Sequence, residues 1–243
     1  MQGLAPYWID PADDSCRFPD VEHALHEPDG LLAVGGDLRP RRLLAAYSQG
    51  IFPWYNEDQP ILWWAPDPRM VLFPEHLKIS RSLHKTLRKD LFRVTLDTAF
   101  ADVILACAEP RSGTDGTWIS QEMIQAYCRL HELGYAHSVE CWREGELVGG
   151  LYGVAIGQVF FGESMFARAT DASKVAFIHL VQQLARWSFR LIDCQIYSSH
   201  LQSLGAKTIS RKDFCRLIEQ YCELPRAEGK WQFENTDAIS PSS

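Results

Sequence analysis

Several motifs that would reveal a function directly are missing from this sequence. The seven cysteines form no C-x-x-C pair and the eight histidines form no H-E-x-x-H spacing, so neither a zinc site nor a disulfide framework is indicated. The pair Gly35-Gly36 is not followed by Lys-Ser or Lys-Thr, which argues against a phosphate-binding P-loop at that turn. We therefore expect no metal and no cofactor.

Long apolar runs are also lacking. No run approaches the length of a membrane span, and the first residues show no basic-then-apolar signal pattern, so we expect a soluble, cytoplasmic protein with no membrane partner. The chain has 243 residues, of which 46% are hydrophobic. That is enough for a sizeable core in one large domain or two small ones. The tail beyond Glu223 shows little periodicity, and we expect it to fray.

Acids are almost absent from residues 76–93, although the whole chain has a net charge of −7. Asp90 is the only acid of this segment. Its cations are Lys78, Arg81, Lys85, Arg88, Lys89 and Arg93. A solvated helix face is one explanation, but charged helices normally mix both signs. Contact with a phosphate backbone is the sharper interpretation of this segment.

Residues 136–196 carry the most regular pattern of the chain. Three short apolar runs are separated by turn signals at Glu144-Gly145 and at Gly157, which predicts an antiparallel meander. Residues 171–189 then place apolar side chains at helical spacing, and residues 191–196 form another short strand-like run. Strand, helix and strand in one unit predict a parallel pair joined by a right-handed crossover.

Two carboxylates interrupt these predicted strands. Because side chains alternate along a strand, Glu163 should share a face with Phe161 and Met165, and Asp193 should share a face with Gln195. Strands of a parallel pair are usually apolar on both faces, and a buried carboxylate is costly unless it is paired or bound. One such carboxylate could simply support a neighbouring loop. Two on adjacent strands, with an amide close by, predict a polar site.

Aromatic side chains gather in residues 51–64, a stretch punctuated by Pro53 and Pro60. They are Phe52, Trp54, Tyr55, Trp63 and Trp64. In a proline-rich loop such side chains either cap a core or wall a ligand pocket, and composition alone favours the cap.

Short stretches in order along nearly the full chain carry a family resemblance. They are GLLAVGGDL (30–38), GIFPWY (50–55), ILWWAPDPR (61–69), ISRSL (79–83), GTWI (116–119), LHELGYAHSVE (130–140), LVGGLYGV (147–154), FGESMF (161–166), DASK (171–174), LIDCQ (191–195) and SLGA (203–206). Together they resemble the leucyl/phenylalanyl-tRNA–protein transferase family, far more specifically than any one motif would.

The resemblance implies a two-part α/β (α+β) protein. We expect a small N-terminal α/β domain with the basic helix in residues 1–92. Residues 93–243 should form a C-terminal catalytic domain similar to acetyl-CoA-dependent N-acyltransferases, a GNAT-like fold. The implied reaction moves Leu or Phe, and less well Met, from aminoacyl-tRNA to the N-terminal Arg or Lys of an acceptor protein. The product would carry a degradation signal of the N-end rule pathway.

The resemblance also implies site residues where its motifs stand in this chain. The polar catalytic centre would comprise Glu163, Asp193 and Gln195. The pocket for the aminoacyl side chain would comprise Trp54, Trp118, Leu151, Phe160 and Met165. Contacts with the tRNA acceptor stem would come from Arg81, Arg88 and Lys89.

Two roles for Asp193 stay open. It could take the proton of the attacking amine as a general base, with Gln195 fixing its geometry. Alternatively it could orient the amine electrostatically while another group, such as a tRNA hydroxyl, moves the proton. We expect Glu163 to bind a positive group of the acceptor, either its N-terminal amine or its basic side chain.

Two other functions compete with this one. An acyl-CoA N-acyltransferase usually has a glycine-containing loop that binds pyrophosphate at a helix N-terminus. Here residues 168–174 contain no glycine, and Asp171 lies where phosphates would approach. A non-catalytic tRNA-binding module would explain the basic helix but not the paired carboxylates, which repel phosphate.

Overall fold

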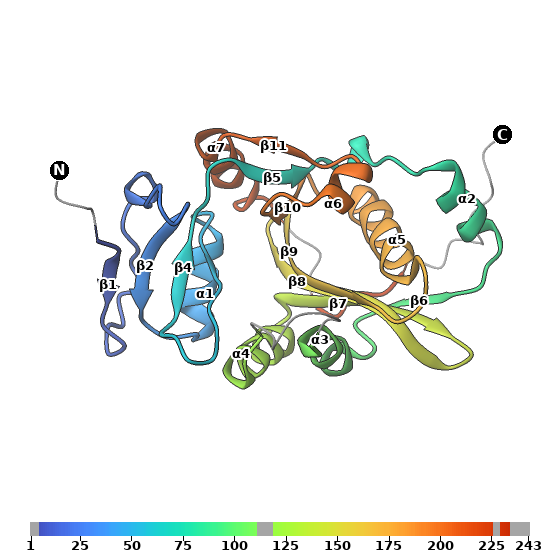
Figure 1. Ribbon diagram of the computed structural model, residues 1–243, viewed down its shortest axis with the longest axis horizontal. Helices are drawn as coiled ribbons and strands as arrows, with labels where there is room; N and C mark the ends of the chain where they lie inside the picture. Colours follow the sequence, from blue (N-terminus) through green and yellow to red (C-terminus); the bar gives the residue numbers. More distant parts are fainter. Residues whose placement is uncertain (1–4, 111–118, 226–228, 234–243) are drawn as a thin grey trace.

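The structure, a computed structural model, describes residues 5–110, 119–225 and 229–233, and its elements form two β-sheets (Figure 1). The smaller, four-stranded sheet has the order β1-β2-β4-β3 and packs against helix α1. The bounds are β1 Tyr7–Ile9, β2 Leu31–Gly35, α1 Pro40–Tyr47, β3 Phe52–Pro53 and β4 Leu62–Trp64. A 3₁₀ helix, Val21–His23, lies between β1 and β2.

The larger, seven-stranded sheet has the order β11-β5-β10-β9-β8-β7-β6. Its strands are β5 Arg69–Leu72, β6 Arg93–Leu96, β7 Ala136–Arg143, β8 Glu146–Ile156, β9 Val159–Ala167, β10 Leu191–Gln195 and β11 Lys207–Ile209. The helices after the small sheet are α2 Arg81–Arg88, α3 Phe100–Ala108, α4 Gln121–Glu132, α5 Ala172–Arg186, α6 Ser199–Ser203 and α7 Arg211–Tyr221, with a 3₁₀ turn at Pro74–His76.

The connections from β7 to β10 are those predicted from the sequence. Strands β7, β8 and β9 form an antiparallel meander, and β10 pairs parallel with β9. Helix α5 crosses between β9 and β10 and covers one face of the sheet, whereas α3 and α4 cover the other (Figure 1). The expected mixed α/β class, with a small N-terminal part and a larger C-terminal part, is therefore confirmed.

The two sheets divide the chain between Trp64 and Arg69, ahead of the 92/93 boundary expected from the sequence. The reason is β5, which follows the small sheet directly but pairs antiparallel with both β10 and β11. Helix α2, expected in the N-terminal domain, packs Leu83 into the core beneath α5. Strand β5 and α2 therefore belong to the body of the larger sheet.

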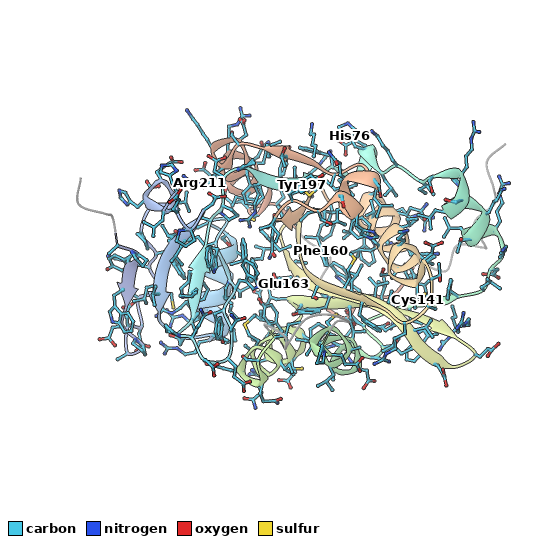
Figure 2. All side chains as sticks on the ribbon, in the orientation of Figure 1. His76, Cys141, Phe160, Glu163, Tyr197 and Arg211 are labelled. Atoms are coloured by element: carbon cyan, nitrogen blue, oxygen red, sulfur yellow. The ribbon has the colours of Figure 1, made fainter. Side chains whose placement is uncertain are left out.

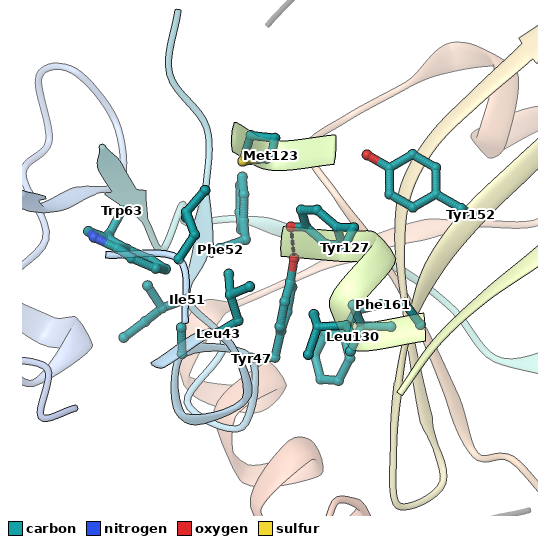
Figure 3. Packing of buried hydrophobic residues seen from close by; sticks show 14 of the residues in the cluster. Leu43, Tyr47, Ile51, Phe52, Trp63, Met123, Tyr127, Leu130, Tyr152 and Phe161 are labelled. Carbon is teal, nitrogen blue, oxygen red and sulfur yellow. Dashed lines mark hydrogen bonds between the residues drawn. The ribbon is translucent and has the colours of Figure 1, made fainter. Parts of the chain in front are cut away.

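Two apolar cores lie on opposite faces of the larger sheet. One packs beneath α5, and the other joins α3 and α4 to the small sheet and α1. Figure 3 shows this second core, where Tyr47 of α1 meets Tyr127 of α4 and their hydroxyl groups form a hydrogen bond. The small sheet is thus joined to the larger one by shared apolar packing.

The expectation that the tail frays is wrong for residues 229–233. Trp231 is only 2% exposed and lies in the core beneath α5. Its ring stacks on His137 at 3.7 Å between centroids and contacts Phe160 in a tilted arrangement at 5.9 Å between centroids. Its backbone N–H donates to Asp97 Oδ2 at 2.7 Å. One large aromatic side chain anchors this segment, and periodicity cannot reveal an isolated anchor.

Candidate active site

Strands β9 and β10 separate from each other at the predicted polar centre. Their parallel pairing ends where Asp193 lies opposite Phe161. Immediately afterwards each strand contains a β-bulge, with Glu163 as the extra residue of β9 and Cys194 as the extra residue of β10. Bulges bend a strand and redirect side chains, and they are frequent beside active sites.

The bulge in β9 corrects one expectation about faces. Phe161 belongs to the core on the α3/α4 side, whereas Met165 packs against the core beneath α5. The two side chains therefore do not share a face, because one inserted residue shifts the alternation by one position. Gly153 lies opposite the bulge, where a Cβ atom would come within 2.3 Å of the Phe161 carbonyl oxygen. Only glycine fits there.

The separated strands open a pocket of about 380 Å³ between β9, β10 and the loop after β3. The predicted polar residues Glu163, Asp193 and Gln195 line it. So do the predicted pocket residues Trp54, Leu151, Phe160 and Met165. Trp118 lies outside the described residues. Figure 2 shows Glu163 and Phe160 close together near the middle of the molecule.

Asp193 forms a buried ion pair with Arg69 of β5. Arg69 Nε donates to Oδ1 at 2.8 Å and Nη2 donates to Oδ2 at 2.7 Å, and the two side chains are 1% and 0% exposed. The guanidinium also lies between the rings of Phe52 and Phe214, at 4.7 and 4.6 Å from their centroids. A bidentate pair of this kind fixes both the charge and the orientation of the carboxylate.

Gln195 connects the two carboxylates. Its backbone N–H donates to Asp193 Oδ1 at 2.9 Å, and its side-chain Nε2 donates to Glu163 Oε1, also at 2.9 Å. Its φ is 61°, in the left-handed region that residues other than glycine rarely adopt. Such backbone outliers concentrate at functional sites, and this one lets a single residue bind both acids.

Glu163 is held by two tyrosines from outside its own sheet. Tyr47 donates to Oε1 at 2.7 Å and Tyr127 donates to Oε2 at 2.9 Å. Burial raises the pKa of the Glu163 carboxyl to about 7, although the hydrogen bonds from both tyrosines oppose the shift. Burial likewise raises the pKa of both tyrosines well above the usual value, so their hydroxyl groups act as donors.

Exposed apolar side chains surround the mouth of the pocket. Trp54 is 40% exposed, and Tyr197, which follows β10, is 60% exposed. The Trp54 carbonyl accepts a hydrogen bond from Trp64 Nε1 at 2.6 Å, which fixes the loop that carries it. The pocket thus has an apolar rim and wall around one acidic end.

The predicted tRNA contacts Arg81, Arg88 and Lys89 lie outside the pocket, exposed on α2. Thr86 of α2 donates to Asp171 Oδ2 at 3.2 Å, which places α2 against the N-terminus of α5. Lys174 Nζ lies 3.0 Å from the other oxygen of Asp171. The start of α5 therefore presents a carboxylate where a pyrophosphate would need a free helix end.

Within the described part of the chain, no three His, Cys, Asp or Glu side chains come together in a way that could hold a metal ion. No helix among those residues is both long and apolar enough to cross a membrane.

Comparison with known proteins identifies the family. The model for the leucyl/phenylalanyl-tRNA protein transferase matches residues 71–219, and the model for its N-terminal domain matches residues 36–67. The chain belongs to the leucyl/phenylalanyl-tRNA–protein transferase family. A leucyl/phenylalanyl-tRNA–protein transferase of Aromatoleum aromaticum is 61% identical over 92% of this chain and 94% of its own length. One of Nitrosomonas europaea is 60% identical over 90% and 93%.

Similarity to solved structures is much weaker than similarity to these transferases. A GCN5-related N-acetyltransferase from Kribbella flavida matches 70% of this chain and 61% of its own, with a TM-score of 0.37 and 11% identity. At that level nothing about the chemistry follows from it. The transferase is an enzyme by its family, and the boundary between the two family models at residues 67–71 agrees with the division between the two sheets.

Three residues of this candidate site were missed by the sequence reasoning. Arg69 had a signal, because it is a lone cation at the start of the apolar run MVLF, one residue after Pro68. Tyr47 and Tyr127 had none, because a tyrosine on the apolar face of an amphipathic helix resembles any other core residue. Only the folded chain shows that their hydroxyl groups reach Glu163.

Proposed function

We propose that this transferase moves Leu or Phe, and less well Met, from aminoacyl-tRNA to the N-terminal α-amine of proteins that begin with Arg or Lys. One observation carries the proposal. A single pocket joins an apolar slot, lined by Leu151, Phe160 and Met165, to the linked acids Glu163 and Asp193. The apolar slot suits an aminoacyl side chain, and the acidic end suits a basic N-terminus. The product would carry an N-end rule degradation signal.

Apolar pockets discriminate between side chains by size and shape. Each methylene changes binding by about 1–3 kcal/mol, so this slot should favour Leu and Phe over Ala or Val. A flexible, unbranched Met side chain should enter as well, which explains the expected weaker use of Met.

The acidic end of the pocket suits an acceptor that begins with Arg or Lys. Such an acceptor brings two positive groups, the α-ammonium and the side chain. Hydrogen bonds between ionised partners are about twice as strong as neutral ones. We assign Glu163 to the α-amine, because Glu163 is a partly exposed residue of the pocket lining, whereas Asp193 is fully buried and paired with Arg69.

Reaction between the two substrates needs little chemical assistance. The donor is an activated ester, and an α-amine with a pKa of ~7.7–8.0 is partly neutral at physiological pH. Holding both reactants in place can supply up to about 7–11 kcal/mol of the barrier reduction. The Arg69 pair favours the orienting role for Asp193, because protonating Asp193 would leave a buried guanidinium without its counter-ion.

The body of the tRNA would be bound outside this pocket. The exposed cations of α2 are suited to phosphate contacts along the acceptor stem, and α2 lies against α5, which contributes Phe177 to the pocket wall. We place the protein in the cytoplasm, where charged tRNA is found. We also propose that the transfer uses neither a metal nor a cofactor.

A transfer assay tests the proposal. Radiolabelled Leu-tRNA is incubated with the full chain and a peptide that begins with Arg, and with the same peptide beginning with Ala. We expect label on the Arg peptide only. Labelling of neither peptide, or of both equally, would overturn the proposal.

Variants of the apolar slot test its assignment in the same assay. Met165→Ala should lower the preference for Leu over Val about tenfold, the effect of roughly one methylene. Trp118→Ala is expected to act in the same direction. The control is Met123→Ala, which truncates a buried methionine of α4 that does not line the pocket. Unchanged selectivity in Met165→Ala would count against the slot.

A further inference from the structure

Three oxygen-bearing groups meet on one side of the pocket. Tyr47 contacts Glu163 Oε1, Tyr127 contacts Glu163 Oε2, and the two tyrosine hydroxyl groups contact each other. The three residues come from three separate elements, α1, α4 and β9, so three parts of the fold meet at one carboxyl group. Gln195 adds a further donor to Oε1.

The number of hydrogen atoms on Glu163, Tyr47 and Tyr127 determines which hydrogen bonds these three groups can form. Each tyrosine hydroxyl has one hydrogen, so the two tyrosines supply two hydrogens for three contacts. When Glu163 is ionised, both tyrosines can donate to it. When Glu163 is protonated, its own hydrogen completes the third contact and closes the ring. Glu163 can therefore gain or lose a proton without leaving a buried polar group unpaired, which would otherwise cost about 1–3 kcal/mol.

We propose that Glu163 takes the proton released by the attacking α-amine, and that Tyr47 and Tyr127 are positioning residues that hold it for this task. This inference rests on the proposed aminoacyl transfer. It deepens the role of Glu163, whose charge first attracts the ammonium group of the acceptor. With this role for Glu163, Asp193 does not need to transfer a proton, and its ion pair with Arg69 stays intact.

The proton balance of the transfer is closed within the site. The nitrogen lone pair forms the bond to the ester carbonyl carbon, and the C–O bond to the tRNA ribose breaks with its electron pair on oxygen. The proton that leaves nitrogen goes to the Glu163 carboxylate and then to the departing ribose oxygen. The ammonium group of the acceptor first releases one proton to solvent, and aminolysis by the resulting neutral amine then neither consumes nor releases a further proton.

The groups around Glu163 tune it for this exchange. Burial, and to a smaller extent the charge of Asp193 on β10, raise the pKa of Glu163, while hydrogen bonds from Tyr47, Tyr127 and Gln195 lower it. Tyr152 of β8 is a further titratable neighbour, and its own pKa is raised well above the usual value by burial and by the charge of Glu163. The net pKa of about 7 lies close to the operating pH, where a general base is most effective.

The pH dependence of turnover tests the inference. Single-turnover rates are measured from pH 5.5 to 9.5 with saturating Leu-tRNA and the Arg peptide, for Tyr47→Phe and Tyr127→Phe. Each variant loses one donor to the ionised carboxylate, so the acidic limb should move up by about one pH unit, with the wild-type rate recovered near pH 9. The amine of the peptide titrates identically in every variant, so only the protein can cause a difference.

The control is Tyr55→Phe, because Tyr55 is a buried tyrosine that does not line the pocket and whose hydroxyl donates to Glu122 instead of Glu163. It should leave the limb in place. Equal loss of turnover at every pH in the Tyr47 and Tyr127 variants would show a merely structural role and overturn the inference. The proposed transfer would survive that result, since wild-type labelling of the Arg peptide tests it separately.

A direct titration covers variants that fail to fold. Carboxyl ¹³C NMR of wild-type protein labelled at glutamate should show one resonance titrating near pH 7, absent in Glu163→Gln. Turnover of Glu163→Gln should fall about 10²–10⁴-fold, the usual contribution of general base catalysis. A Glu163 resonance that titrates near pH 4, or full turnover in Glu163→Gln, would refute the assignment.

Discussion

The Arg69 guanidinium lies between two carboxylate oxygens and two aromatic rings, and so links β5, β10, β3 and α7. Replacing one member of a buried ion pair leaves the other charge without its partner, which typically costs about 3–5 kcal/mol. Arg69→Met should therefore lower the free energy of unfolding by that amount, measured by urea denaturation. The flexible methionine keeps most of the packing between the rings.

The double variant Arg69→Met/Asp193→Asn separates stability from function. Neither charge of the Arg69–Asp193 pair remains in it, so much of the lost stability should return, while aminoacyl transfer stays low. A double variant as unstable as Arg69→Met alone would show that packing, and not charge, makes Arg69 necessary.

Glu163 should make stability depend on pH. In the unfolded chain a glutamate ionises near pH ~4.3, whereas in the folded protein its pKa is about 7. Between these values the folded state binds more protons, so the free energy of unfolding falls as pH rises and levels off above about pH 7. The slope is at most about 1.4 kcal/mol per pH unit.

Glu163→Gln should remove this contribution to the slope. Urea denaturation at pH 5, 6, 7 and 8 measures it, with Glu146→Gln as a control that removes an exposed carboxylate. An identical slope in wild type and Glu163→Gln would contradict the raised pKa.

At the scale of elements, α2 presents the cations of residues 81–89 to solvent while Leu83 anchors it to the core. Reversing Arg81, Arg88 and Lys89 to Glu should weaken tRNA binding. It should also reduce the salt dependence of binding by up to about three phosphate contacts. Transfer from a minimal aminoacyl-adenosine donor should be nearly unchanged. Filter binding at several salt concentrations measures the first two effects.

The matched control reverses three exposed cations on other helices, namely Arg129, Lys212 and Arg216. Both sets change the net charge equally. Equal loss of tRNA affinity in both would show that overall charge, and not α2, determines binding.

Most elements, but not the irregularities between them, could be predicted from the sequence. Helical spacing predicted α5 after Asp171, and turn residues such as Gly157 predicted the hairpins of the meander. The bulges at Glu163 and Cys194 could not be predicted, because a bulge depends on how two strands pair and leaves no periodic signal. Those two inserted residues open the pocket. The hydrophobic pattern alone would have placed the pocket residues in a continuous sheet, so the family motifs were needed to identify them.

At the scale of the whole molecule, the pocket lies where the two sheets meet. Strand β3 of the small sheet supplies Phe52 and the loop after it supplies Trp54, and the large sheet supplies the acids on β9 and β10. Tyr47 of α1 and Tyr127 of α4 cross the same boundary to reach Glu163. Because both parts contribute to one site, any shift of the small sheet would change the pocket and the proton-holding group together.

The C-terminal segment supports this pocket from the opposite side. Trp231 contacts Phe160, whose ring forms part of the apolar wall, and also packs against Trp187 and Phe189. Trp231→Ala should lower the free energy of unfolding by about 3–5 kcal/mol. It should also raise KM for Leu-tRNA, because Phe160 loses the support behind it. Urea denaturation and initial rates measure the two effects.

Trp142→Ala provides the comparison, since Trp142 packs against Arg93 at the far hairpin and does not line the pocket. It should destabilise the protein without changing KM. If Trp231→Ala lowered stability but left both KM and the preference for Leu over Val unchanged, the segment around Trp231 would stabilise the fold without shaping the pocket. A raised KM in Trp231→Ala but not in Trp142→Ala would show that the tail, although distant in sequence, helps to shape the aminoacyl pocket.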